Sequence, residues 1–356
     1  MRVAKTIRCK IWKATKAKRS ILEAEYDNLQ LYLQTGIDDG LYSANKQQAD
    51  RFFKKVKKGK QYPISLRNDL IRVEKRDTKL VKYWIRIPVA GRRGGIWLPV
   101  KPHCDFPKEF EISESKIIKK KDGFYIHVTI NKEIAQKTSC SSIIAIDLGE
   151  RVIATVCNSL DMRPIFMGRE VRGIRRHFAW LRKRLGKKKL LKEIKRIGQK
   201  EQRIVDAYLH DISRRIVDEA ARTDSIIVFG DLKGIRSAAK GKGRRFNRIV
   251  SNMPLYKLTE MIKYKARWKG VPTLQRNDYK TSITCSKCKE EGKRPYQGLF
   301  KCVNANCGYQ ANADWNAVQN ILERAKEYIS SAGVPVNVPI TESFLVSSEA
   351  TQLVGW

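Results

Sequence analysis

The spacing of hydrophobic positions changes along the chain and indicates two kinds of unit. Residues 3–11 alternate as in a strand, and a basic helical stretch lies around residues 46–58. Between residues 68 and 130, short β-like runs alternate with Gly, Pro and charged turns. Four large side chains between these segments recur at helical spacing: Leu22, Tyr26, Leu29 and Leu33. The first 140 residues therefore predict a β-barrel-like unit with a helical insertion at about 17–60.

From Ser141 onward the pattern alternates strands with helices. Helical periodicity covers a basic stretch at 171–205, a segment containing Ile212 and Ile216, and a helix at 254–268. The order β-β-β-α-β-α-β-α predicts an α/β domain with an RNase-H-like sheet, in which the first, fourth and fifth strands are parallel neighbours. The five predicted strands cover residues 143–147, 152–156, 164–168, 225–230 and 271–277.

The excess of basic over acidic residues indicates a negatively charged binding partner. The 356 residues include 73 Lys and Arg against 36 Asp and Glu, a formal net charge of +37. So large an excess repels itself in a compact protein, and nucleic acid is the anion that most often compensates it. No apolar run is long enough to span a bilayer, so we expect a cytoplasmic protein with no membrane partner.

Four of the eight cysteines form a metal-ligand pattern. Two of them are separated by two residues and the other two by four residues, with a thirteen-residue spacer between the pairs. Two such pairs supply the four thiolates of a tetrahedral structural Zn²⁺, and a reducing cytoplasm argues against disulfides. The predicted zinc ligands are Cys285, Cys288, Cys302 and Cys307.

Two aspartates are placed for metal chemistry. Asp147 ends an apolar strand, and Asp314 lies in the first turn of the last helix, whose inner face carries Ala313, Ala317 and Ile321. Carboxylates at the end of a sheet can share Mg²⁺, which stabilises the attacking and leaving oxygens of a phosphodiester. Taken singly, each aspartate is more often a turn or N-cap residue, so the prediction depends on both being brought together.

These motifs resemble the TnpB (OrfB-type) transposon-encoded RNA-guided nucleases, which are relatives of the type V CRISPR effectors. The resemblance covers about residues 141–325 and is weaker before them. It implies a guide RNA from the transposon end, a double-stranded DNA target and one RuvC site that cuts DNA. The motifs read IIAIDLGERVIATV, SIIVFGDLKGIR, TSITCSKC and CVNANCGYQANADWNAVQNI.

The chain departs from this family at its second catalytic motif. The family has Glu-Asp-Leu at the end of the strand, and this chain has Gly230, Asp231 and Leu232. Asp231 is adjacent, although successive side chains on a strand face opposite ways. Asp278 ends the next parallel strand, and similar proteins with this glycine carry a glutamate at about that place. Glu219, in the preceding helix, is a weaker candidate.

Three functions remain open from the sequence. The first is an endonuclease that uses Asp147, Asp314 and either Asp278 or Asp231. The second is a guided, repressor-like DNA-binding protein that does not cut, and the third is a general RNA-binding zinc-ribbon protein. The expected domains are a wedge barrel at 1–140, a RuvC core at 141–282, a zinc ribbon at 283–310, the last RuvC helix at 311–328 and a flexible tail at 329–356.

Overall fold

The fold was analysed in a computed structural model of the chain. It divides into two compact units, Met1–Ile134 and Ala135–Trp356. The residues that the structure describes are 1–76, 78–135, 140–230, 241, 243, 247, 254–276 and 280–331. Most of the predicted tail at 329–356 therefore lies outside the described residues.

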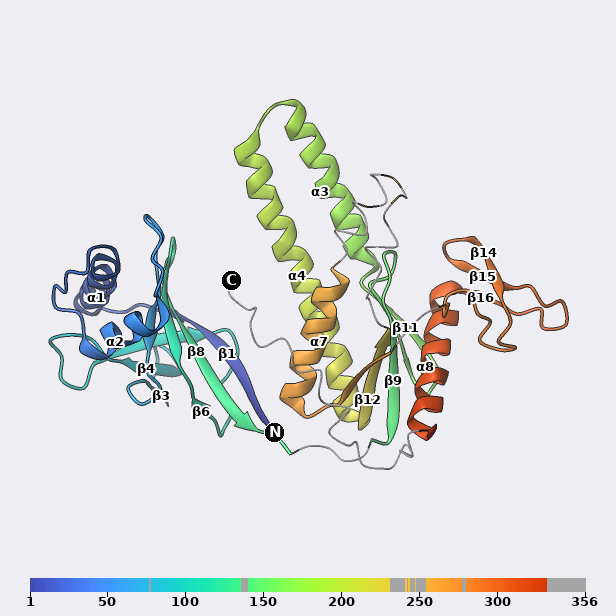
Figure 1. Cartoon of the computed structure of the whole chain (residues 1–356), viewed down its shortest axis with the longest axis horizontal. Coiled ribbons are helices and arrows are strands. Elements are labelled where there is room, and N and C mark those ends of the chain that lie inside the picture. The colour runs from blue at the N-terminus through green and yellow to red at the C-terminus, as the bar shows by residue number, and fades with distance from the viewer. Residues whose placement is uncertain are drawn as a thin grey trace. The chain divides into compact units, whose positions relative to one another are not determined.

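The first unit is built on a curled 8-stranded sheet (Figure 1). Its central strands β1 and β8 pair antiparallel along most of their length, and alternate side chains such as Ile7, Ile126 and Val128 are fully buried. The strands follow the order β2-β7-β8-β1-β5-β4-β3, with β6 paired to β8. They are β1 (Arg2–Ile11), β2 (Ile64–Leu66), β3 (Arg72–Lys75), β4 (Tyr83–Ile87), β5 (Ile96–Pro102), β6 (Glu111–Ile112), β7 (Ser115–Lys120) and β8 (Gly123–Glu133).

Two helices, α1 (Lys16–Thr35) and α2 (Ser43–Phe52), lie between β1 and β2 in the chain, where the helical insertion was predicted. The carboxylate of Glu25 is buried between them and accepts hydrogen bonds from the Asn45 side chain at 2.7 Å and from the backbone of Tyr42 at 3.0 Å. The prediction that the second helix continues to residue 58 was wrong, because Phe53 leaves the helical conformation and packs against Tyr62, with ring centroids 5.0 Å apart.

The second unit contains a 5-stranded sheet with the order β11-β10-β9-β12-β13. Strand β12 is parallel to both β9 and β13, so the first, fourth and fifth strands are parallel neighbours, as the sequence predicted. The second strand begins two residues later than predicted, because Val152 and Ile153 belong to the preceding turn. The strands are β9 (Ser142–Asp147), β10 (Ala154–Asn158), β11 (Pro164–Met167), β12 (Ser225–Gly230) and β13 (Thr273–Arg276).

Helices cover both faces of this sheet (Figure 1). Ile144 and Ile146 of β9 pack into the core that includes α4 (Leu191–Arg222) and α7 (Leu255–Lys269). Ala145, on the opposite face, packs into the core that includes α8 (Ala313–Ser331). The continuous apolar character of β9 follows from this burial on both sides.

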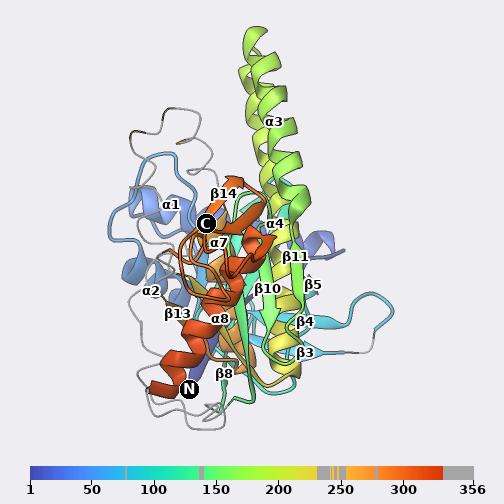
Figure 2. The ribbon, with the colours of Figure 1, turned by 90° about the vertical axis from the view of Figure 1, so that its right-hand side faces the viewer.

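The basic segment after β11 forms a helical hairpin that extends beyond the sheet (Figure 2). Its first arm is α3 (Arg169–Lys187), and its second arm is the 32-residue helix α4. The chain turns at Lys189, which has a positive φ of 54°. The basic stretch at 171–205, predicted as a single helical segment, is therefore divided between two helices.

The cysteine-rich segment forms a small antiparallel sheet of three strands in the order β14-β15-β16. These are β14 (Gly292–Tyr296), β15 (Leu299–Cys302) and β16 (Gln310–Asn312). Within the described ranges, no helix is both long and apolar enough to cross a membrane.

Candidate functional site

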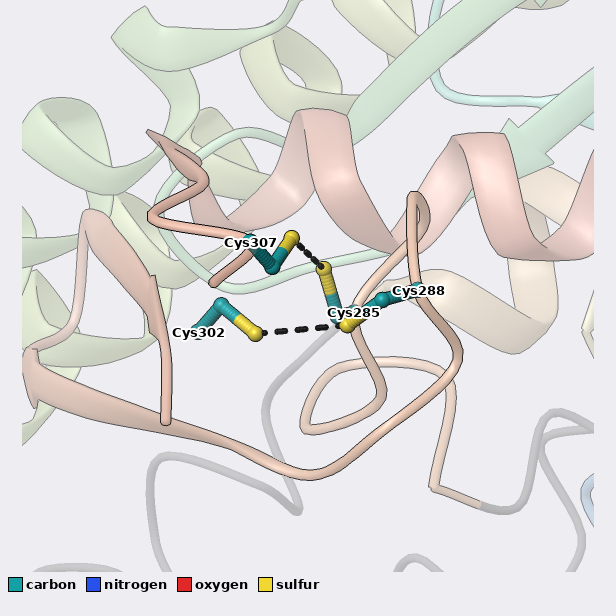
Figure 3. Close-up of side chains that lie close together, drawn as sticks. All are labelled: Cys285, Cys288, Cys302 and Cys307. Carbon is teal, nitrogen blue, oxygen red and sulfur yellow. Dashed lines mark hydrogen bonds between the residues drawn. The ribbon is translucent and has the colours of Figure 1, made fainter. Parts of the chain in front are cut away.

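The four predicted zinc ligands lie together in the small sheet (Figure 3). The sulfur atoms of Cys285 and Cys307 are 3.9 Å apart, those of Cys288 and Cys302 are 3.4 Å apart, and all four lie within 4.8 Å of one another. A tetrahedron with Zn–S bonds of 2.3 Å has sulfur atoms about 3.8 Å apart. The cluster therefore has the dimensions needed to hold a structural metal such as zinc.

Two buried cysteines outside this cluster have thiols that do not ionise at neutral pH. Cys9 and Cys157 are fully buried, and burial raises the pKa of Cys9 to about 12 and that of Cys157 to about 11. Such thiols stay protonated at neutral pH and behave as small apolar side chains.

Two buried asparagines attach the cysteine-rich segment to helix α8. The side chain of Asn316 accepts a hydrogen bond from the backbone of Ser286 at 2.9 Å and donates one to the carbonyl of Thr284 at 2.8 Å. Asn320 donates to Thr281 at 2.9 Å and to Thr284 at 2.7 Å. Because buried amides are costly to leave unpaired, these bonds fix the cysteine-rich segment relative to the start of α8.

Asp314 occupies the first turn of α8, as predicted. The side-chain oxygen of Asn312 caps this turn by accepting a hydrogen bond from the backbone of Asp314 at 2.9 Å. The Asp314 side chain is only 19% exposed, and its carboxylate lies 3.8 Å from the guanidinium of Arg294. Burial raises the pKa of Asp314, against the opposing effect of Arg294, Arg151 and Arg169. A desolvated carboxylate of this kind suits binding of a cation.

Asp147 is half-buried at the end of β9. Because side chains alternate along a strand, Asp147 lies on the same face as Ile143 and Ala145. Both of these residues pack into the core that includes α8. Asp147 therefore lies on the face of the sheet that α8 covers.

A chain of contacts places Asp147 and Asp314 at the same end of that face. Glu150, in the turn after β9, accepts a hydrogen bond at 3.5 Å from the side chain of Gln297. The next residue of that turn, Arg151, packs closely on Gly298: a side chain at position 298 would place its β-carbon 2.8 Å from the Arg151 guanidinium. The carbonyl of Gly298 in turn accepts a 3.3 Å bond from the backbone of Ala313, at the start of α8. Both aspartates adjoin this junction between the turn after β9 and the β14–β15 turn.

The register of β12 on β9 also locates Gly230, which stands where the TnpB proteins that this chain resembles have a glutamate. Phe229 pairs with Ile146, so the next residue, Gly230, follows beside Asp147. Asp231 and Asp278 lie outside the described residues. Glu219 adjoins the opposite end of the sheet: its carbonyl accepts a bond from Thr223, and the carbonyl of Thr223 accepts one from Ser142, at the first residue of β9. Glu219 is therefore not a third ligand for a metal at Asp147.

A pocket of about 430 Å³ adjoins Asp314. Its lining includes Asn312 and Asp314 together with Tyr296 and Gly298 of the β14–β15 hairpin. Four arginines also line the pocket: Arg151, Arg169, Arg172 and Arg176.

The sequence predictions included neither the pocket-lining role of these arginines nor the contacts of the two buried asparagines. The spacing of three and four residues between Arg169, Arg172 and Arg176 on a helix could have revealed the first group. Asn316 and Asn320, four residues apart on an otherwise apolar helix face, could have revealed the second.

Comparisons with known proteins agree with the motifs. The TNB domain of Cas12f1-like proteins matches residues 256–321, from α7 through the cysteine-rich segment into α8. A CRISPR-associated endodeoxyribonuclease, Cas12f2, of a Micrarchaeota archaeon is 28% identical over 218 residues, which are 57% of this chain and 40% of that protein. A TnpB-like protein of Methanocaldococcus jannaschii is 28% identical over 228 residues, which are 61% of this chain and 80% of that protein.

A solved structure supports the fold. The AacC2c1 protein in a ternary complex with sgRNA and extended non-target DNA has a TM-score of 0.52 at 9% sequence identity, covering 76% of this chain and 56% of that one. At this identity the similarity concerns the mixed α/β fold alone.

Proposed function

We propose that this chain, a relative of TnpB-like and Cas12f proteins, is an RNA-guided DNA endonuclease with a single RuvC-type site. The observation that carries the proposal is the position of Asp147 and Asp314 at one end of one face of the second sheet. We assign residues 141–282 and 311–328 to an RNase-H-like RuvC core, 283–310 to a zinc ribbon and 1–140 to a wedge barrel. The parallel arrangement of β9, β12 and β13 supports the first assignment.

In this proposal the two aspartates hold Mg²⁺. Both are carboxylates that the fold partly withdraws from water, and carboxylate oxygens are the ligands that Mg²⁺ prefers. The chemistry that Mg²⁺ supplies in such a site is stabilisation of the attacking and leaving oxygens of the phosphodiester. Asp278 or Asp231 supplies the third carboxylate in place of Gly230, beside Asp147.

The remaining parts of the proposal concern the partners. A guide RNA, derived from the end of a transposon, pairs with the target DNA and supplies the sequence specificity. The basic surface neutralises the phosphates of both nucleic acids, in line with the net charge of +37. The zinc ribbon positions the start of α8 through Asn316 and Asn320.

The test is cleavage of a matched double-stranded DNA by the protein purified with its copurified RNA, in the presence of Mg²⁺. We expect the wild-type complex to cut this DNA, and Asp147→Ala to abolish cleavage while keeping the RNA. Tight binding of matched DNA by a wild-type complex that never cuts it would instead establish the repressor-like alternative, in which Gly230 marks an inactive site.

The same assay identifies the third carboxylate. Asp278→Ala and Asp231→Ala are compared in parallel, since each changes one acidic side chain. Loss of cleavage only in Asp278→Ala assigns the role to Asp278. Full activity in that variant, together with loss in Asp231→Ala, assigns the role to Asp231.

A further inference from the structure

The solvent face of helix α3 carries a continuous basic stripe. Its buried side consists of Val171 and Phe178, with Ile174 half-buried against the same core. The exposed positions on the opposite side recur at alternating spacings of four and three, so they form one row along the helix. This row, called the α3 stripe below, consists of Arg169, Gly173, Arg176, Trp180, Lys183 and Lys187.

The N-terminal end of the stripe lies at the pocket beside Asp314, because Arg169, Gly173 and Arg176 line that pocket. Arg172, also in the lining, forms an ion pair with Glu150 at 3.0 Å. Among the residues that the structure describes, Arg169 and Arg176 have no carboxylate within ion-pair distance. Two guanidinium groups beside the pocket are therefore available to an external anion.

The middle of the stripe carries an exposed aromatic ring. Trp180 is 51% exposed, which is unusual for the largest apolar side chain. The guanidinium of Arg184 lies 4.7 Å from its ring centroid, and the ring of His177 lies at 6.0 Å with an interplanar angle of 31°. An exposed aromatic ring with a basic side chain beside it is the arrangement on which unpaired bases stack in proteins that bind single strands.

We propose that the α3 stripe binds one single strand of DNA and leads it to the pocket beside Asp314. Phosphates contact Arg169 and Arg176, and an unpaired base stacks on Trp180. The occupant is a single strand because a base inside a duplex has no free face for the ring. It is DNA because the stripe ends at the site proposed above to cut DNA, and the inference rests on that function.

The test measures binding of a fluorescently labelled thymidine oligonucleotide to the purified protein–RNA complex in magnesium-free buffer without a chelator, where the proposed site does not cut. We expect Trp180→Ala to weaken binding roughly 5- to 150-fold, as for loss of one stacked base. Trp180→Phe keeps a ring and should retain most of the affinity. Tyr256→Ala, which removes an exposed aromatic side chain from α7, is the matched control and should bind as wild type.

The arginines are tested by salt dependence. Each phosphate contact on a single strand contributes about 0.7 to the slope of log affinity against log salt. The double variant Arg169→Ala/Arg176→Ala should therefore lower that slope by about 1.4. Arg214→Ala, which removes an exposed arginine paired with Asp211, should leave the slope unchanged.

Three results would overturn the proposal: wild-type affinity in Trp180→Ala, equal losses in Trp180→Phe and Trp180→Ala, or loss of copurified RNA from Trp180→Ala. The last would assign the stripe to the guide RNA. Because binding is measured without cleavage, the two proposals fail separately. A wild-type complex that never cuts DNA contradicts the nuclease, and a Trp180→Ala complex that binds and cuts normally contradicts only the stripe.

Discussion

Asp314 combines two opposing influences on one carboxylate. Its side chain is largely withdrawn from water, which disfavours the charged form, and three arginines around it favour that form. Burial is the larger effect, so the pKa of Asp314 is raised. The protein therefore keeps an ionisable side chain at a position where its charged form costs folding free energy, as is common for residues that bind a cation.

This balance predicts the effect of Asp314→Asn on stability. An unfolded aspartate has a pKa of about 3.9, and the folded value is higher. The wild-type protein thus loses stability relative to Asp314→Asn as the pH rises from the unfolded pKa through the folded pKa. In magnesium-free buffer at pH 7, Asp314→Asn should raise Tm by a few degrees, about 2–4 °C for each kcal/mol in a domain of this size.

The measurement is thermal unfolding of both proteins in magnesium-free buffer without a chelator, between pH 3 and pH 8. The difference in Tm should shrink toward pH 3, where both side chains are neutral. A lower Tm for Asp314→Asn at pH 7 would mean that the arginines and the helix dipole outweigh burial.

At the same scale, the sequence correctly predicted that Asp147 ends a strand and that Asp314 lies in the first turn of a helix, because a strand end and a capped helix start are local patterns. It could not show that Arg151 joins Arg169, Arg172 and Arg176 at one pocket, since Arg151 and Arg169 come together only through the folded turn after β9. The exclusion of Glu219 also required the structure, because only the bonds of Thr223 and Ser142 show which end of the sheet it adjoins.

At the scale of elements, the cysteine-rich segment supports the start of α8. Its small strands bury little apolar surface: the core of this segment consists of Cys285, Phe300 and Ala313, with a few partly buried neighbours. We expect such a segment to depend on a metal for its stability, because a few residues cannot offset the entropy of ordering the chain. The hydrogen bonds of Asn316 and Asn320 then fix the start of α8, and with it Asp314, relative to this segment.

Cys302→Ser tests this dependence. The wild-type protein should contain about one zinc ion per chain, and Cys302→Ser should lose it, because three thiolates no longer complete the tetrahedron. Metal analysis of the purified proteins measures this directly, and DNA cleavage should fall with the zinc content. Cys104→Ser, outside the cluster, is the control and should keep the metal. Full zinc occupancy in Cys302→Ser would contradict the four-thiolate site.

Most helices and strands of both units could be predicted from the spacing of hydrophobic residues along the sequence, but several of their first and last residues could not. The second helix was predicted too long because its lysines have good helix propensity, although nothing apolar holds them against the sheet. The turn at Lys189 is signalled in the sequence only by Gly186, three residues earlier, so the split into α3 and α4 was not predicted. Short strands such as β2 and β6 were missed because two or three residues show no period.

At the scale of the whole molecule, the chain joins a curled β-sheet unit to an α/β unit, and both belong to a protein with a net charge of +37. Length and composition predicted nucleic acid as the partner, because phosphates are the natural counterions of so basic a surface. Neither charge nor fold determines whether the protein cuts what it binds. In the proposed function, that depends on the acidic residues near Asp147, because this chain has Gly230 where the TnpB proteins it resembles have a glutamate.

The most direct test of the account is a crystal structure of the protein in Mn²⁺, a scattering substitute for Mg²⁺, with anomalous maps of wild type and Asp314→Asn. We predict an anomalous peak between the carboxylates of Asp147 and Asp314 in the wild-type protein, and its loss in the variant. Carboxylates too far apart to share an ion, or a wild-type map without manganese at this position, would contradict the account.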